Sequence, residues 1–137
     1  MLRPETTLTP ELKTLLSLAM FPDPQRTAQT LATYANDPTR LVYAWSVGGQ
    51  MVSAAGVSVQ VSGNAAEVLH IGTAPQFRGQ GYGRALLHGI RAHLGLTTLS
   101  AETDDQAVAF YRRSGFEIAP LPSVWSTPRF RCTLSGV

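Results

Sequence analysis

The hydrophobic positions at the start of the chain recur every three or four residues, which is the period of an amphipathic helix. In "TPELKTLLSLAM" this pattern predicts a helix with Thr9 as its N-cap and Pro10 as its first helical residue. The "FPDP" sequence should end that helix, and Asp23 is then placed to cap a second one. The apolar stripe of this second helix is predicted to consist of Ala28, Leu31, Ala32 and Ala35.

After Asp37 the pattern changes to runs that are rich in β-forming residues. "RLVYAWSV" and "QMVSAAGVSVQV" are separated by Gly48-Gly49, which predicts a hairpin, and "AAEVLHIGT" predicts a third antiparallel strand. Helical and extended runs then alternate, with a helix to about Leu94, a strand at "TTLSAET", a helix at "DDQAVAFYRRSGF" and two closing strands. The mixture of antiparallel and alternating segments predicts an α+β protein with a mixed sheet.

Composition narrows the class of protein. The 137 residues are 44% hydrophobic and 15% charged, which is typical of one compact domain spanning residues 1–137. The formal net charge of +2 is too small to favour nucleic acid as a partner. The one cysteine, Cys132, excludes an intramolecular disulfide and fits a reducing compartment. We therefore expect a cytoplasmic protein with no membrane partner and no metal, since the three histidines lack metal-ligand spacing.

The stretch "QFRGQGYGRALL" places Gly79, Gly81 and Gly83 immediately before a predicted helix. Free N–H groups at a helix N-terminus, approached through residues without Cβ atoms, form an anion site. A P-loop is excluded because Arg84 and Ala85 follow the last glycine, where lysine and serine or threonine are needed. The spacing also lacks the third glycine of the dinucleotide fingerprint. The alternative is that the glycines serve only close helix packing.

Two motifs in this region carry a family resemblance. "RGQGYGRALL" resembles the Arg/Gln-x-x-Gly-x-Gly/Ala motif of the GCN5-related N-acetyltransferase (GNAT) superfamily, and "AVAFYRRSGF" is similar to that family's Ala-x-x-x-Tyr-x-x-x-Gly-Phe helix. The matching segment runs from Glu67 to Phe116. The resemblance implies a mixed, mostly antiparallel sheet of about six or seven strands with about four helices on its two faces. It also implies splayed strands at a cleft for acyl-coenzyme A.

The same resemblance implies a function and a ligand. The chain would be an N-acetyltransferase that uses acetyl-coenzyme A as co-substrate and transfers the acetyl group to a primary amine by direct attack in a ternary complex. The alternative is a non-catalytic acyl-coenzyme A sensor or interaction module. Asp104 stands where the family often has asparagine, so a cofactor contact there stays open. The other residues expected to hold the cofactor are Ile71, Gly72, Thr73, Arg78, Gly79, Gln80, Gly81, Tyr82, Gly83 and Arg84.

Acyl transfer to an amine needs an acid for the leaving thiolate and a base for the amine. By its place in the motif Tyr111 is the candidate general acid, with a core aromatic as the alternative. Glu67 is the candidate general base, with a solvent-facing strand residue as the alternative, and Glu102 is a further candidate. Strand alternation predicts one face with Glu67, Leu69, Ile71 and Thr73, and an opposite, core-facing side with Val68, His70 and Gly72. His70 is thereby predicted to have a core or supporting role.

The acceptor amine is not identified by the sequence. Family analogy places its cleft between the first two helices, the "MFPDPQR" turn and "PLPSVW". The sequence leaves open whether the chain forms a homodimer. Four aromatic residues could line the cleft or belong to the core: Phe21, Tyr43, Trp45 and Trp125.

Overall fold

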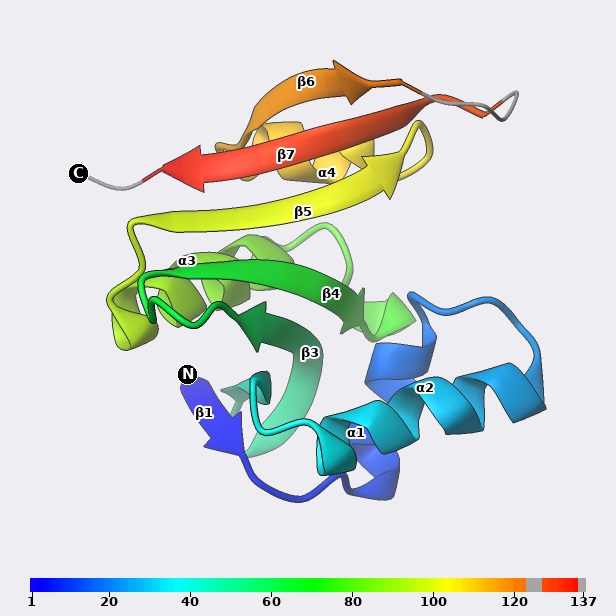
Figure 1. Cartoon of the computed structure of the whole chain (residues 1–137). Helices are drawn as coiled ribbons and strands as arrows, with labels where there is room; N and C mark the ends of the chain where they lie inside the picture. Colours follow the sequence, from blue (N-terminus) through cyan, green and yellow to red (C-terminus); the bar gives the residue numbers. More distant parts are fainter. Residues whose placement is uncertain (123–126, 136–137) are drawn as a thin grey trace.

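The computed structural model describes residues 1–122 and 127–135 and forms one open seven-stranded sheet (Figure 1). The strand order is β1-β2-β3-β4-β5-β7-β6, and every neighbouring pair is antiparallel except β4 and β5. The elements in chain order are β1 (Leu2–Glu5), α1 (Pro10–Ser17), α2 (Pro24–Asn36), β2 (Arg40–Val47), β3 (Gln50–Val59), β4 (Ala65–Thr73), a short 3₁₀ turn (Pro75–Phe77), α3 (Tyr82–Leu94), β5 (Thr98–Asp104), α4 (Val108–Arg113), β6 (Glu117–Leu121) and β7 (Arg129–Ser135).

Helices cover both faces of the sheet (Figure 1). On one face α3 and α4 bury a cluster that includes Leu86, Leu87 and Ile90. On the other face α1 and α2 pack a second cluster around Leu12 and Leu16. This mixed, mostly antiparallel sheet between two helical layers is the predicted fold class, which is confirmed.

The local signals at the helix ends and hairpin turn are confirmed. The Thr9 hydroxyl accepts the N–H of Leu12 at 3.3 Å, and the Asp23 carboxylate accepts the N–H of Gln25 at 3.0 Å. Gly48 and Gly49 have φ of +57° and +80°, the left-handed conformations that a tight β2–β3 hairpin requires. These features depend on neighbours in the chain, which is why the sequence predicts them well.

The predicted apolar stripe of α2 is wrong in three of its four positions. Ala28, Ala32 and Ala35 are not buried in the core, whereas Leu31 packs against the α1–α2 cluster and Tyr34 is buried with 8% of its surface exposed. An aromatic ring buries far more apolar surface than a row of methyl groups, so the helix turns Tyr34 toward the sheet.

Two of the aromatic residues considered for the acceptor cleft lie on the α3 side instead. Tyr43 is buried in the cluster under α3 and packs edge-to-face against His93, with ring centroids 5.6 Å apart. Trp45 packs against the same cluster. Strand alternation on β2 puts both side chains on this face, so they belong to the core. Trp125 lies outside the described residues.

The parallel strands β4 and β5 part from each other, as predicted. Their pairing runs only from Ala65 opposite Thr98 to Val68 opposite Ala101. Both strands continue beyond this point, β4 to Thr73 and β5 to Asp104. The facing edges of their last residues are therefore not paired with each other.

A β-bulge in β4 changes the predicted facing of its residues. Val57 of β3 pairs with Val68 and Gly56 with His70, so Leu69 has no partner across the ladder. Val68 and Ile71 pack under α3, whereas Leu69 packs with the α1–α2 cluster. The expectation that His70 shares the face of Val68 is therefore wrong. The extra residue turns His70 toward α2, onto the face that carries Glu67.

Gly56 leaves the space that the Tyr34 ring occupies. A Cβ atom at Gly56 would overlap the Tyr34 phenol. We expect Gly56→Ala to lower the free energy of unfolding by about 1–3 kcal/mol, because the overpacked ring must move. Urea unfolding of the wild type, Gly56→Ala, Tyr34→Leu and the double variant measures this. An equal loss from Gly56→Ala in the Tyr34→Leu background would show that the phenol is not the cause.

Candidate active site

The glycine-rich loop lies where β4 has ended and α3 begins. Gly79 and Gly81 have φ of +78° and +84°, which side chains other than glycine rarely adopt. A Cβ atom at either position would meet no other atom within 4 Å. Glycine is needed at these two positions because of the positive φ values. The open space around them leaves the backbone accessible to a ligand.

The backbone of this loop presents a run of free donors. Within the described residues, no N–H from Gly79 to Arg84 donates to a protein acceptor, and the first helical bond runs from Ala85 N–H to the Gly81 carbonyl. Gly81 is the N-cap of α3 and has no side chain to satisfy these groups. Arg84 is exposed, and it forms no ion pair with another described residue. Such donors, together with the positive end of a helix dipole, favour a polyanionic ligand.

Gly83 differs from the other two glycines because it is buried. A Cβ atom there would lie 2.9 Å from the Phe110 ring and 3.6 Å from Thr73 Oγ1. The packing explanation therefore holds for Gly83, which brings the first turn of α3 against α4 and the end of β4. Its N–H stays in the run of free donors.

The end of β4 is held in position by side chains from neighbouring elements. Ser53 is fully buried, and its hydroxyl lies 3.0 Å from the Gly72 carbonyl and 2.9 Å from Thr73 Oγ1. Arg78 donates from Nε to the Thr73 carbonyl at 3.3 Å. A Cβ atom at Gly72 would overlap the Leu15 carbonyl, so this glycine lets α1 approach. The edge from Ile71 to Thr73 that β5 leaves unpaired is thus held by these contacts beside the glycine loop.

Tyr111 has a buried ring and a hydroxyl without a partner among the described residues. The residue is 6% exposed, and its ring packs edge-to-face against Phe110 and Phe116 at centroid distances of 5.1 and 5.3 Å. Burial, and then the charge of Cys132, raise the pKa of Tyr111 above its usual value, so the phenol keeps its proton at neutral pH. The ring is part of the core, and the hydroxyl keeps its proton.

Asp104 is engaged with its own backbone. Its carboxylate accepts the N–H of Gln106 at 3.0 Å and of Ala107 at 3.1 Å, which caps the turn leading into α4. A contact between Asp104 and the cofactor stays a prediction.

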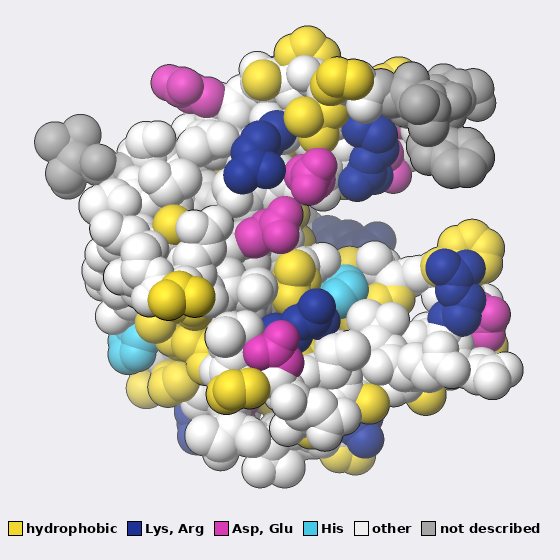
Figure 2. Space-filling view, viewed as in Figure 1, with side chains coloured by type: hydrophobic (Ala, Val, Ile, Leu, Met, Phe, Trp, Pro, Cys, Tyr) yellow, Lys and Arg dark blue, Asp and Glu magenta, His cyan; other side chains and the backbone are white. Residues whose placement is uncertain are grey.

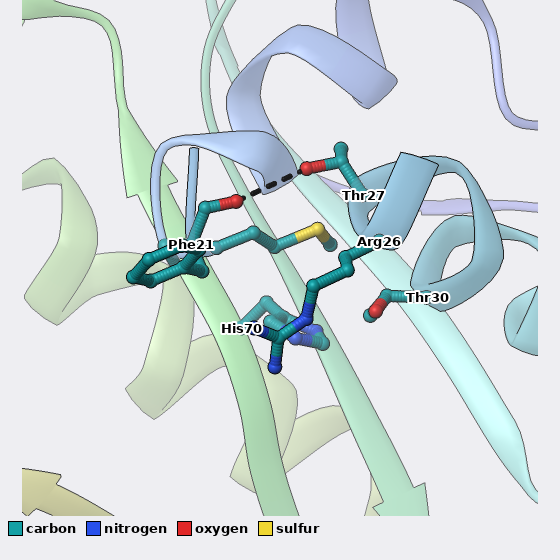
Figure 3. Close-up of a pocket in the computed structure, with 7 residues that line it drawn as sticks. Phe21, Arg26, Thr27, Thr30 and His70 are labelled. Atoms are coloured by element: carbon teal, nitrogen blue, oxygen red, sulfur yellow. Dashed lines mark hydrogen bonds between the residues drawn. The ribbon is translucent and has the colours of Figure 1, made fainter. Parts of the chain in front are cut away.

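On the face of β4 that is turned away from α3 and α4, a pocket opens between α2 and the sheet (Figure 3). The α1–α2 turn and the start of α2 supply most of its lining, and His70 supplies its wall on β4. The Arg26 guanidinium lies over the Phe21 ring at 5.2 Å, and Thr27 donates to the Phe21 carbonyl at 3.3 Å. The lining residues are Ala19, Met20, Phe21, Arg26, Thr27, Thr30 and His70.

The pocket belongs to a larger recess between α2 and the β5–β7–β6 part of the sheet (Figure 2). Strand alternation places Glu67, Ser100 and Glu102 on this face, since Ala66, Val68 and Ala101 belong to the cluster under α3. Arg131 reaches the Ser100 hydroxyl at 3.4 Å. Glu67 is half-buried and Glu102 is exposed. The sequence-predicted Glu67 therefore faces the recess, although it is not among the residues lining the pocket.

His70, which lines this pocket, makes a close polar contact with Tyr34. The Tyr34 hydroxyl lies 2.6 Å from Nδ1 of His70. Burial, and then the positive charge of Arg40, lower the pKa of His70, so the imidazole is neutral at pH 7. Burial raises the pKa of Tyr34. Sequence reasoning missed this pair, because no sequence signal marked the bulge at Leu69.

The described residues contain no group of three or more His, Cys, Asp or Glu side chains that could hold a metal ion. Among the helices of the described ranges, none combines the length and the apolar character needed to cross a bilayer.

Comparison with known proteins identifies relatives of the fold. Among solved structures, an aminoglycoside 6'-N-acetyltransferase complexed with coenzyme A is 18% identical, with a TM-score of 0.76 over 98% of this chain and 96% of that one. A GNAT family acetyltransferase from Elizabethkingia anophelis with acetyl-CoA bound is 18% identical, with a TM-score of 0.71 over 98% and 97%. The aminoglycoside 6'-N-acetyltransferase from Enterococcus faecium is 19% identical, with a TM-score of 0.74 over 98% and 96%.

No curated protein matches the chain. The family described as acetyltransferase (GNAT) domain matches residues 38–118, which is more than half of the chain and includes both motifs, the glycine loop and the Tyr111 helix. The sequence match and the shared fold agree, and the chain therefore belongs to the GNAT family of acetyltransferases.

Proposed function

We propose that this chain is an N-acetyltransferase that transfers an acetyl group from acetyl-coenzyme A to a primary amine by direct attack in a ternary complex. The observation that supports this best is the run of free N–H donors from Gly79 to Arg84, next to the edge of β4 that β5 leaves unpaired. Coenzyme A carries a diphosphate and an amide-containing arm, which match these two features. Solved relatives with coenzyme A or acetyl-CoA bound support the same ligand.

In this proposal the diphosphate binds the backbone of Gly79, Gln80, Gly81, Tyr82, Gly83 and Arg84, with the Arg78 and Arg84 side chains beside it. The pantetheine arm pairs with Ile71, Gly72 and Thr73 as an additional strand in the gap between β4 and β5. The thioester then lies at the splay, between the α3 side of the sheet and the recess. A backbone N–H of this unpaired edge stabilises the oxyanion.

Tyr111 is proposed as the acid that protonates the departing thiolate. Its hydroxyl keeps its proton and has no partner among the described residues, so it is available for a ligand sulfur. Glu67 remains a candidate base because it faces the recess. The same face of β4 supplies a second candidate, His70, which lines the pocket.

The pocket is proposed to bind the acceptor. None of its described lining residues is a carboxylate, whereas Arg26 provides a positive charge beside the Phe21 ring. This lining favours an amine that carries a carboxylate and an apolar group over a polycation such as an aminoglycoside. The "MFPDPQR" turn predicted to frame the cleft supplies Met20, Phe21 and Arg26 to the lining.

The function is tested by following free thiol release from acetyl-CoA in the presence of amino acids, simple monoamines, aminoglycosides and peptides. We expect amine-dependent release, with the highest kcat/KM for amines that bear a carboxylate. Calorimetry measures acetyl-CoA binding in the same samples. Tight binding of acetyl-CoA without release by any amine would favour the non-catalytic sensor or interaction module.

A further inference from the structure

We propose that His70 is the general base that accepts the proton of the acceptor amine, and that Tyr34 is a positioning residue that holds the imidazole in its active tautomer. This inference rests on the proposed acetyl transfer. It concerns a residue that strand alternation assigns to the opposite face, and the β4 bulge places it at the pocket.

The position of His70 suits a base. It lies in the half of β4 that no longer pairs with β5, because that pairing ends at Val68. The thioester is proposed to bind along the adjoining residues Ile71 to Thr73. His70 also lines the pocket formed by α2 and the α1–α2 turn (Figure 3). An amine in that pocket would therefore lie between the imidazole and the thioester carbonyl.

The contact with Tyr34 engages one ring nitrogen of His70 and leaves the other free. Nδ1 lies 2.6 Å from the Tyr34 hydroxyl, while Nε2 makes no hydrogen bond to another described residue. When Nδ1–H donates to the phenol oxygen, the lone pair is on Nε2, the nitrogen that has no partner among the described residues. The phenol remains protonated because burial raises its pKa, and its oxygen can stabilise the imidazolium that forms.

Neighbouring residues on β3 and β4 make the contact between Tyr34 and His70 possible. Gly56, directly opposite His70 on β3, has no side chain and so admits the Tyr34 ring. The rings of Tyr34 and His70 meet edge-to-face with centroids 5.8 Å apart. The unpaired Leu69 gives β4 the extra residue that turns His70 to this side. The bulge at Leu69 and the missing side chain at Gly56 therefore together allow the Tyr34 ring to contact this imidazole.

Charged groups lie on three elements around His70, and of these Arg40 shifts its pKa. From β2 the guanidinium of Arg40 disfavours the imidazolium, although Asp37 pairs with it at 3.7 Å. From α2, Arg26 lines the same pocket. From β4 itself, Glu67 shares the face of His70. Burial is the largest influence and acts in the same direction as Arg40, so the pKa of His70 lies below its usual value of about 6.5.

The chemical step conserves atoms and charge. The nitrogen of the free amine bonds to the thioester carbonyl carbon, and His70 Nε2 takes one proton from that nitrogen. The carbon–sulfur bond breaks, its electron pair stays on sulfur, and the thiolate takes a proton from the Tyr111 phenol. The imidazolium then returns its proton to water, and water reprotonates the phenolate. The products are the N-acetyl amine and coenzyme A with a free thiol.

The experiment is a pH profile of kcat/KM with the best acceptor, for the wild type, His70→Gln, Tyr34→Phe and the control His93→Gln. In the wild type we expect a logarithmic slope of about two below the pKa of His70, because both the amine and the imidazole must be unprotonated, and about one above it. His70→Gln should give a slope of about one throughout and lower kcat by on the order of 10- to 100-fold. His93→Gln, on the exposed side of α3, should retain the wild-type profile.

Nitrogen NMR of the histidine ring provides a readout that does not depend on activity. We expect His70 of the wild type to carry its proton on Nδ1 and to titrate below about 6.5. Tyr34→Phe should mix the tautomers and lower kcat with KM unchanged, while the unfolding midpoint stays near that of the wild type.

Three results would overturn the proposal. The first is that the logarithmic slope of about two persists in His70→Gln. The second is that this slope falls to about one in Glu67→Gln instead of in His70→Gln. The third is that the wild-type imidazole carries its proton on Nε2. If the wild type itself shows no amine-dependent thiol release, the proposed function fails, which is a different result from active enzyme with an unchanged profile in His70→Gln.

Discussion

Replacing Gly81 with valine is expected to weaken acetyl-CoA binding by at least about 100-fold. The residue has a φ of +84° and precedes the first turn of α3, in the middle of the run of free N–H donors. A branched side chain would project into the space above those donors, which is open. Losing two charge-assisted hydrogen bonds of about 1.5 kcal/mol each corresponds to roughly a 100-fold change in affinity.

Gly63→Val is the matched control for this substitution. Gly63 has a φ of +78° and open space around its Cβ position, but it lies in the β3–β4 turn. Both variants carry the same kind of backbone strain, of about 1–2 kcal/mol. Calorimetry should therefore show weakened acetyl-CoA binding only for Gly81→Val. Equal affinities in the two variants would show that the glycine loop is not the diphosphate site.

Tyr111→Phe is expected to lower kcat by roughly 1,000-fold, with the KM for acetyl-CoA nearly unchanged. The substitution keeps the ring that packs against Phe110 and Phe116 and removes only the hydroxyl. Because that hydroxyl makes no hydrogen bond within the described residues, its loss should cost little stability. A selective effect on kcat would therefore report its role as an acid.

Tyr43→Phe removes a second buried hydroxyl from the same hydrophobic cluster and serves as the control. Burial raises the pKa of Tyr43 as well, but its ring packs against His93 on the far part of α3. Steady-state kinetics and urea unfolding of both variants separate catalysis from packing. Wild-type kcat in Tyr111→Phe would leave Tyr111 as a core aromatic only.

The family motifs could be recognised from the sequence because the structural features behind them are local. Positive φ at Gly79 and Gly81 and the free donors of α3 arise within a few consecutive residues. Strand alternation predicted correctly that Ile71 and Thr73 share a face, but it failed where β4 gains an unpaired residue. Pattern reasoning assumes a regular pleat, and one bulge reverses the facing of the residues before it relative to the residues after it.

Among the residues that the sequence offers for the acceptor cleft, only the folded structure separates those at the pocket from those in the core. The sequence predicts that the "MFPDPQR" turn frames the acceptor cleft, and this turn supplies part of the pocket lining. Tyr43 and Trp45 were equally aromatic in the sequence, and their contacts with the cluster under α3 place them elsewhere. Hydrophobic character predicts that a side chain is buried, whereas the packing of helices on the two faces of a sheet determines which cluster it joins.

Short-range interactions in the sequence account for the caps at Thr9 and Asp23, the Gly48-Gly49 hairpin and the glycine loop with its free N–H donors, since each involves residues close together in the chain. The pairing of Tyr34 with His70 joins residues 36 positions apart. It requires the β4 bulge, the absence of a side chain at Gly56 and the rotation of α2 that buries Tyr34 in place of its alanines. Each of these depends on how large side chains fill the space between helix and sheet, so only the folded chain brings the imidazole to the pocket.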